Sequence, residues 1–264
     1  MRPQLRSITS PREKPKNQVL EMDCVYKGFH GNGSFLPVLE EISFQVERGE
    51  LICILGRSGC GKSTLLKIVA GFLPPSSGKV LLKNQPVEGP GPERCVIFQE
   101  DALFPWLTVQ ENIAFGLRGR GLDQKSKAQE VERFLSLVGM NEFRNYLPGE
   151  ISGGMKQRVS LARVLILQPE VLLMDEPFVS LDAQSREEMQ NLLLSLRQEW
   201  AHTILFVTHD VNEAVILADR ILLMSKNPGC IREEIEVDLP RPRTRDSSPF
   251  MDLGRRLYDA LRES

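Results

Sequence analysis

The stretch from Leu51 to Gly71, LICILGRSGCGKSTLLKIVAG, constrains the fold more than any other part of this chain. It begins with the apolar run Leu51–Leu55, which predicts a buried strand. A glycine-containing turn follows, and then apolar residues recur at helical spacing up to Gly71. Further strands and helices alternate downstream, so the sequence predicts an α/β protein with a mainly parallel sheet.

The turn in this stretch has the pattern of a phosphate-binding loop, G-x-x-x-x-G-K-[ST]. Its glycines allow backbone conformations that a Cβ would forbid, so successive N–H groups can point at phosphate oxygens. Lys62 is expected to reach the β- and γ-phosphates, and the Ser63 hydroxyl to ligate Mg²⁺. A chance glycine turn would not be expected to fall between a strand and a helix. The residues predicted to surround the phosphates are Gly56, Arg57, Ser58, Gly59, Cys60, Gly61, Lys62, Ser63 and Thr64.

The composition excludes several classes of protein. The chain has 264 residues and a net charge of -2, which gives no basis for nucleic acid as a partner. No apolar run approaches the ~18 residues that span a bilayer. Residues 1–18 are polar and lack the apolar core of a secretory signal, so we expect a disordered tail. The five cysteines are odd in number and form no C-x-x-C pair, which argues against disulfides and zinc and fits a reducing cytoplasm.

The remaining pattern divides the chain into parts. Val19–Tyr26 and Glu40–Val46 alternate apolar and polar residues, which predicts an antiparallel β layer. Residues from about 101 to 167 have helical periodicity and predict a helical subdomain inserted between strands. The main domain is therefore predicted to span residues 19–238, and residues 239–264 are predicted to form a linker and a final helix.

Two carboxylates follow a second apolar strand. Val171–Met174 is a continuous apolar run, and Asp175 and Glu176 come directly after it. Ligands of open α/β sheets bind at the carboxyl ends of the strands, so both acids should face the phosphates. Asp175 would hold Mg²⁺, through water, and Glu176 would accept a proton from an attacking water. A nearby Mg²⁺ allows both carboxylates to stay ionised.

A third motif, ISGGMKQR, opens a helix at residues 151–158. Ser152 is a good N-cap residue. Gly153 and Gly154 would each weaken a helix by about 1 kcal/mol, so capping alone does not explain them. Paired glycines leave backbone N–H groups open to close approach by an anion.

These motifs together resemble those of the ATP-binding subunit of an ATP-binding-cassette (ABC) transporter. The resemblance covers about Val19 to Val237. The matching residues are GRSGCGKST at 56–64, Gln99, ISGGMKQR at 151–158, VLLMDEP at 171–177, SLD at 180–182, and His209. The resemblance implies an ABC ATPase of the P-loop NTPase fold: a mainly parallel core, an antiparallel β layer and an inserted helical subdomain. It also implies ATP and Mg²⁺ as cofactors.

The resemblance implies roles for single residues. Phe29 would stack on adenine, with Tyr26 as its competitor, and His209 would contact the γ-phosphate. Gln99 would contact Mg²⁺ and sense the membrane partner. The catalytic residues would be Lys62, Glu176 and His209. The metal ligands would be Ser63, Gln99 and Asp175. ATP would also contact Ser152, Gly153, Gly154 and Asp182. Met155 stands where glutamine is commonest in the family.

The resemblance also implies partners. Each ATP would lie between the phosphate loop of one copy and the ISGGMKQR loop of a second copy, so we expect a homodimer. This dimer would act on membrane permease subunits, and through them on a substrate-binding protein. The chain would lie at the cytoplasmic face of the membrane, and Asp182 would lie at the dimer interface.

A narrower resemblance points to the nitrate/sulfonate/taurine import branch. It rests on five segments: LFPWLTV at 103–109, ENIAFGL at 111–117, DEPF at 175–178, LDAQSR at 181–186 and VDLPRPR at 237–243. Part of the first segment, with its large apolar residues, is expected to line a groove for a helix of the membrane subunit. Import of a thiamine-precursor pyrimidine or cyanate remains an alternative, as does a soluble ABC ATPase of DNA repair or translation. A module without hydrolysis is disfavoured because the expected catalytic residues are all present.

Overall fold

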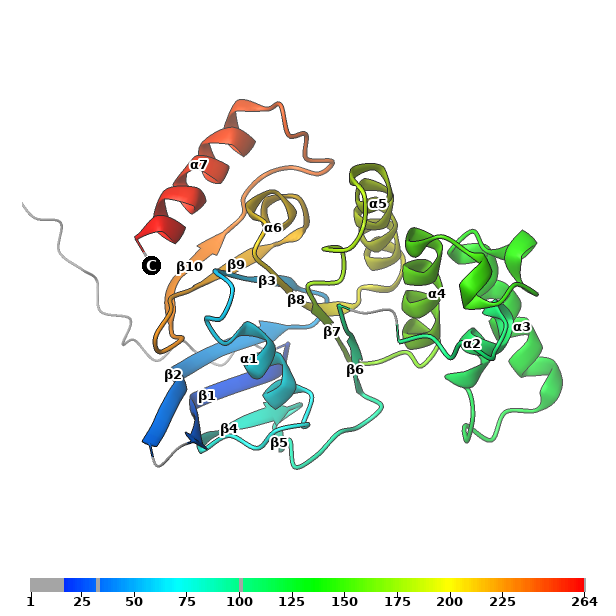
Figure 1. Cartoon of the computed structure of the whole chain (residues 1–264), viewed down its shortest axis with the longest axis horizontal. Helices are drawn as coiled ribbons and strands as arrows, with labels where there is room; N and C mark the ends of the chain where they lie inside the picture. Colours follow the sequence, from blue (N-terminus) through cyan, green and yellow to red (C-terminus); the bar gives the residue numbers. More distant parts are fainter. Residues whose placement is uncertain (1–16, 32–33, 100–101, 264) are drawn as a thin grey trace, which may run out of the picture.

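The computed structural model describes residues 17–31, 34–99 and 102–263. The chain forms two β-sheets, a group of helices at one side and a C-terminal helix at the other (Figure 1). Most of the predicted tail lies outside the described residues. Its last residue, Gln18, is already the first residue of a strand, so the prediction of disorder was wrong there.

The core sheet has six strands in the order β10-β9-β3-β8-β7-β6. Neighbouring strands are parallel, except that β10 pairs with β9 in antiparallel fashion. Every residue of β3 and β8 is buried, as expected of parallel strands covered on both faces. The strands are β3 (Leu51–Gly56), β6 (Arg94–Ile97), β7 (Val171–Asp175), β8 (Thr203–Thr208), β9 (Arg220–Met224) and β10 (Ile231–Glu236).

The predicted antiparallel layer is a second sheet in the order β2-β1-β4-β5. Its strands are β1 (Gln18–Gly31), β2 (Ser34–Glu47), β4 (Ser77–Leu82) and β5 (Gln85–Pro86). The strands β1 and β2 pair over almost their whole length and are longer than predicted. Helix α1 (Lys62–Val69) shares one apolar core with residues of both sheets, so the helix that follows the phosphate loop is held on two sides.

The predicted helical insertion lies between β6 and β7 (Figure 1). It contains α2 (Val109–Phe115), α3 (Gln124–Leu137) and α4 (Gly153–Leu165), with 3-10 turns at Asn141–Phe143 and Pro148–Glu150. Helix α2 begins at Val109 because Thr108 caps it. The Thr108 hydroxyl accepts from the Glu111 N–H at 3.3 Å, and the Glu111 carboxylate accepts from the Thr108 N–H at 2.8 Å.

Three further helices complete the fold: α5 (Ala183–Trp200), α6 (Val211–Leu217) and α7 (Ser248–Arg262). The segment predicted as a linker is packed against α6. Arg243 donates to the carbonyls of Val215 at 2.7 Å and Ala218 at 2.6 Å, which caps the end of α6. Burial lowers the pKa of Arg243 to about 10, and its guanidinium remains charged at neutral pH.

Candidate functional site

The phosphate loop joins β3 to α1, as the sequence predicts. Gly59 and Gly61 have φ angles of 81° and 100°, which only glycine adopts readily. A Cβ on Gly61 would lie 2.7 Å from the Leu39 side chain, so the backbone passes too close for a larger residue. No side chain caps the start of α1. Its first N–H groups are therefore available to an anion.

Lys62 anchors the loop from within. Its side chain is only 4% exposed, and Nζ donates to the Gly56 carbonyl at 2.8 Å and the Arg57 carbonyl at 3.2 Å. Nζ also lies 3.4 Å from a carboxylate oxygen of Glu176. A buried ammonium group needs such partners, and here they connect the phosphate loop to the end of β7.

Glu176 occupies a strained backbone position directly after β7. Its φ is 47°, in the left-handed region that costs a residue with a Cβ about 1–2 kcal/mol. The Glu176 N–H donates to the Val207 carbonyl of β8 at 3.0 Å, which holds this conformation. The carboxylate then lies 2.7 Å from Nδ1 of His209 as well as near Lys62. Strain of this kind is typical of functional sites.

The two predicted metal ligands that lie on β7 and α1 are in contact. The Ser63 hydroxyl donates to Asp175 Oδ1 at 3.0 Å. Burial raises the pKa of Asp175, and the neighbouring Glu176 charge raises it further. A hydroxyl and a carboxylate side by side suit Mg²⁺, which completes its shell with water and nucleotide oxygens. No group of three or more His, Cys, Asp or Glu side chains in the described part of the chain could hold a metal by itself.

Gln99, the third predicted ligand, is exposed two residues after the end of β6. The strand β6 pairs with β7, which places Gln99 at the same edge of the sheet as Asp175. Phe29 lies in β1 with 41% of its surface exposed, and Lys27 Nζ is 5.2 Å from its ring centre. Tyr26 is half-buried. The greater exposure favours Phe29 over Tyr26 as a stacking ring.

The glycine-containing start of α4 also has the predicted form. Ser152 caps the helix and accepts from the Met155 N–H at 3.3 Å. Asp182 caps α5 and accepts from the Ser185 N–H at 2.9 Å, and this bond lowers the pKa of its carboxyl. No described hydrogen bond or ion pair joins residues 152–154 to the phosphate loop, and Figure 1 shows α4 and α1 on different sides of β7. One copy of the chain does not bring the two loops together.

A buried network beside His209 had no signal in the linear sequence. Thr208, which precedes the histidine, donates to Glu213 at 2.7 Å and accepts from the Asp210 N–H at 2.9 Å. Glu213 is 6% exposed, and burial raises the pKa of its carboxyl. These bonds fix the turn that carries the imidazole.

Arg186 connects this turn to the segment after Glu176. It donates to the carbonyl of Phe178 at 3.3 Å and that of Leu181 at 3.0 Å, and it lies 3.9 Å from the Glu213 carboxylate. The segment from Phe178 to Leu181 leads directly to Asp182. The residues around Asp182 and those around His209 are therefore held by one side chain.

Comparison with known proteins identifies this arrangement. The sequence profile of ABC transporter proteins matches residues 39–179, which contain the phosphate loop, residues 151–158 and the two carboxylates. The chain belongs to the ABC transporter family. This cassette therefore binds and hydrolyses ATP, as the resemblance implied.

Two relatives and one solved structure are similar to this chain over most of its length. The nitrate import ATP-binding protein NrtD of Synechococcus elongatus is 44% identical over 86% of this chain and 84% of its own. The taurine import ATP-binding protein TauB of Roseobacter denitrificans is 44% identical over 84% of this chain and 79% of its own. A dimeric, post-hydrolysis structure of the cassette MJ0796 bound to ADP and Pi superposes with a TM-score of 0.71 at 27% identity, covering 84% of this chain and 100% of the other. The predicted fold class is confirmed.

Proposed function

We propose that this cassette is the ATP-hydrolysing subunit of an importer for a small anion such as nitrate, an aliphatic sulfonate or taurine. The observation that carries hydrolysis is the contact of Glu176 with both Lys62 and His209, beside the Ser63–Asp175 pair. The assignment of the cargo rests on the names of the nitrate and taurine import relatives. It also rests on the segments 103–109 and 111–117, which have the residues typical of that branch.

In the proposed mechanism, backbone N–H groups of the phosphate loop and the Lys62 ammonium bind the β- and γ-phosphates. Ser63 and Asp175, with Gln99 at the same sheet edge, would hold Mg²⁺, which supplies positive charge to the phosphate oxygens. Glu176 accepts the proton of the attacking water. The contact between Nδ1 of His209 and Glu176 orients that carboxylate, and the same imidazole ring would lie beside the γ-phosphate.

We propose that the working unit is a homodimer. The separation of α1 from α4 within one copy supports this, because a second copy would supply the exposed Ser152 and Gly153 to the ATP of the first. The solved cassette with ADP and Pi is itself described as dimeric. Asp182, at the start of α5, would lie at this interface.

The segment 103–109 supports a contact with a membrane permease. Trp106 is 71% exposed, while Leu103 packs against the core, so the large apolar residues are divided between surface and interior. Phe104 supports Trp106 at 5.6 Å between ring centres, and Arg163 lies over the Phe104 ring at 5.3 Å. No helix in the described ranges is long and apolar enough to cross a membrane. We place the cassette at the cytoplasmic face, acting through the permease on a substrate-binding protein.

The test is transport in liposomes that contain this cassette together with any permease and binding protein whose genes neighbour its own. Taurine, an alkanesulfonate and nitrate are compared with cyanate, which is another small anion, and with a thiamine-precursor pyrimidine, which is uncharged. ATP hydrolysis stimulated only by the pyrimidine would contradict a small-anion cargo, and stimulation only by cyanate would contradict nitrate, sulfonates and taurine as the cargo. Failure of the permease to couple ATP hydrolysis by this cassette to uptake of any cargo would contradict the importer role.

Trp106→Ala tests the permease contact in the same system. Because the side chain is exposed, we expect unchanged basal ATPase and melting temperature of the isolated cassette, with transport lost in the complex. An equal loss of both activities with a large fall in melting temperature would show that Trp106 belongs to the core.

A further inference from the structure

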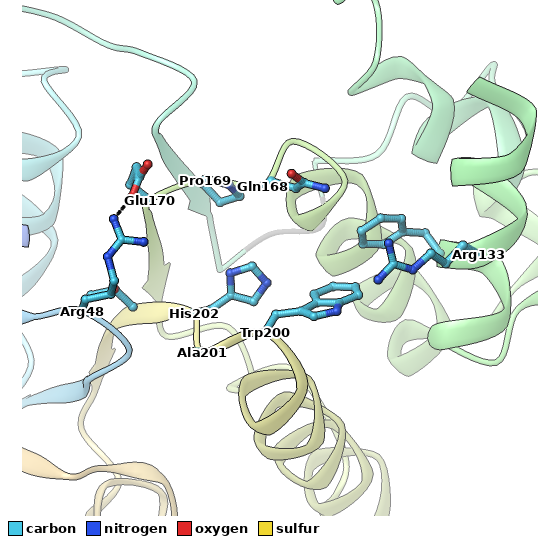
Figure 2. Close-up of a pocket in the computed structure, with 10 residues that line it drawn as sticks. Arg48, Arg133, Gln168, Pro169, Glu170, Trp200, Ala201 and His202 are labelled. Atoms are coloured by element: carbon cyan, nitrogen blue, oxygen red, sulfur yellow. Dashed lines mark hydrogen bonds and ion pairs between the residues drawn. The ribbon is translucent and has the colours of Figure 1, made fainter. Parts of the chain in front are cut away.

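A cavity of about 360 Å³ lies between the helical subdomain and the core sheet (Figure 2). Glu170 precedes β7 and Thr203 begins β8, so the cavity is at the amino ends of these strands. The phosphate loop and Glu176 are at the carboxyl ends. None of the residues assigned to ATP or Mg²⁺ lines this cavity.

Arg133, from α3, presents hydrogen-bond donors at one side of the cavity. Its guanidinium lies over the Trp200 ring, 4.9 Å from the ring centre. Stacking uses the face of the guanidinium and leaves the N–H groups at its edge directed outward. The nearest carboxylates, Glu130 at 3.8 Å and Glu199 at 3.9 Å, are too far for hydrogen bonds.

His202 lies between the two sides of the cavity in Figure 2. Its ring meets Trp200 edge-on, with 5.5 Å between ring centres. The Nε2 atom is buried and has no hydrogen-bond partner among the described residues. Burial lowers the pKa of His202, so the neutral ring can carry its proton on Nε2. A buried polar atom without a partner destabilises the folded chain, and a hydrogen bond to a ligand oxygen would remove that cost.

The opposite side carries two cations that share one carboxylate. Arg48 donates to Glu170 at 2.9 Å, and Lys83 forms a second ion pair with the same carboxylate. Together these cations lower the pKa of Glu170. Because Glu130 and Glu199 lie near Arg133, the charges around the cavity balance, and the unused N–H donors of Arg133 and His202 favour an anionic ligand.

We propose that this cavity binds a small organic anion: a carboxylate or sulfonate attached to a flat, apolar body. The acid group lies between the edge of Arg133 and Nε2 of His202, and the body packs on Trp200 and Pro169. A bare inorganic anion would leave most of the volume unfilled, whereas small-molecule pockets begin at about 300 Å³. Because Arg133 belongs to the helical subdomain and His202 to the core, a bound ligand connects the two.

The fluorescence of Trp200 can be used to measure ligand binding in the cavity. The chain contains two tryptophans, so Trp106→Phe leaves Trp200 as the only indole fluorophore. Benzoate and benzenesulfonate are titrated against this protein, with benzamide as the uncharged control and acetate as the acid without a ring. We expect a saturable change in Trp200 emission with both aromatic anions, and binding weaker by about tenfold or more for benzamide and acetate.

Variants locate the binding site. Arg133→Gln should weaken benzoate binding by about tenfold or more. Lys125→Gln, which removes an exposed charge from the same helix, should leave it unchanged. A variant can also alter Trp200 emission directly, without any change in binding. Benzoate binding is then measured by calorimetric titration of the protein that retains both tryptophans. Circular dichroism confirms that each variant is folded.

Four outcomes would overturn the proposal. Benzamide could bind as well as benzoate, or neither anion could give a saturable signal. Arg133→Gln could bind benzoate like the Lys125→Gln control. Displacement of benzoate by MgATP would place the anion in the nucleotide site instead.

Discussion

The starts of α1 and α4 are both glycine-containing helix N-termini, yet they differ in what surrounds them. At α1, Lys62 is buried and connects its own loop to Glu176. At α4, Ser152 and Gly153 are exposed, and a Cβ on Gly153 would meet no atom within 4 Å. The lysine of the first site is enclosed by its own chain, whereas the residues that begin the second are open to a partner.

This difference separates residues that bind nucleotide within one copy from residues that act across the proposed dimer. Changes at α1 should alter nucleotide binding or chemistry in every copy of the chain. Changes at α4 should alter turnover only where a second copy supplies the loop, if the proposed dimer is correct. The following substitutions test that division, beginning with the largest expected effect.

Glu176→Gln should reduce ATP turnover by about 10²–10⁴-fold, because an amide of the same shape cannot accept the proton. Binding of ATP should remain, and the variant should accumulate as a dimer with ATP. Steady-state phosphate release and light scattering with and without ATP measure the two effects. Turnover comparable to wild type would remove Glu176 from its role as the base.

Lys62→Ala should weaken ATP binding by about tenfold or more, since a charge-assisted contact to the phosphates is lost. This contact lies within one copy of the chain, so the loss of ATP affinity should also appear at protein concentrations too low for dimers to form. Equilibrium binding of a fluorescent ATP analogue measures it. Unchanged affinity would show that the buried ammonium holds the loop without touching nucleotide.

Ser152→Ala should reduce turnover by about tenfold and leave the ATP affinity of a single copy unchanged. Loss of the N-cap bond should also lower stability by about 1 kcal/mol. Thr108→Ala is the matched control, because it removes the cap of α2 at a similar cost. If both variants lose turnover equally, the effect is one of helix stability and the contrast between α1 and α4 fails.

Glu213→Gln should have the smallest effect, and its sign depends on pH. Burial raises the folded-state pKa of Glu213, so its protonated form is favoured by folding. The stability that this contributes is complete below the unfolded pKa and is lost as pH rises through the folded pKa. The variant, which keeps an acceptor for Thr208, should match wild type near pH 4 and become the more stable at pH 8, by about 1 kcal/mol or less. Melting temperatures of the variant and wild type across this pH range measure their difference in stability. A wild type that is the more stable at pH 8 would show that Arg186 stabilises the ionised form.

Much of the site could be predicted from the sequence because its parts are local. The glycine turn, the N-cap at Ser152 and the buried strand before Asp175 each depend on neighbours within a few residues. Spacing and residue type therefore determine them. Element ends were less predictable: β1 and β2 extend beyond the alternating segments because each residue gains a partner on the other strand.

The phosphate loop, the two carboxylates after a buried strand and the capped glycine pair follow from the linear chain, since short-range backbone geometry requires those residues. The partner of Glu176 follows from the fold, because His209 lies 33 residues away and is brought close by the pairing of β7 with β8. The same holds for the Arg186 contacts and for the cavity beside Trp200. These contacts join segments that are distant in the chain, and only the packing of the sheet and the helices brings them together.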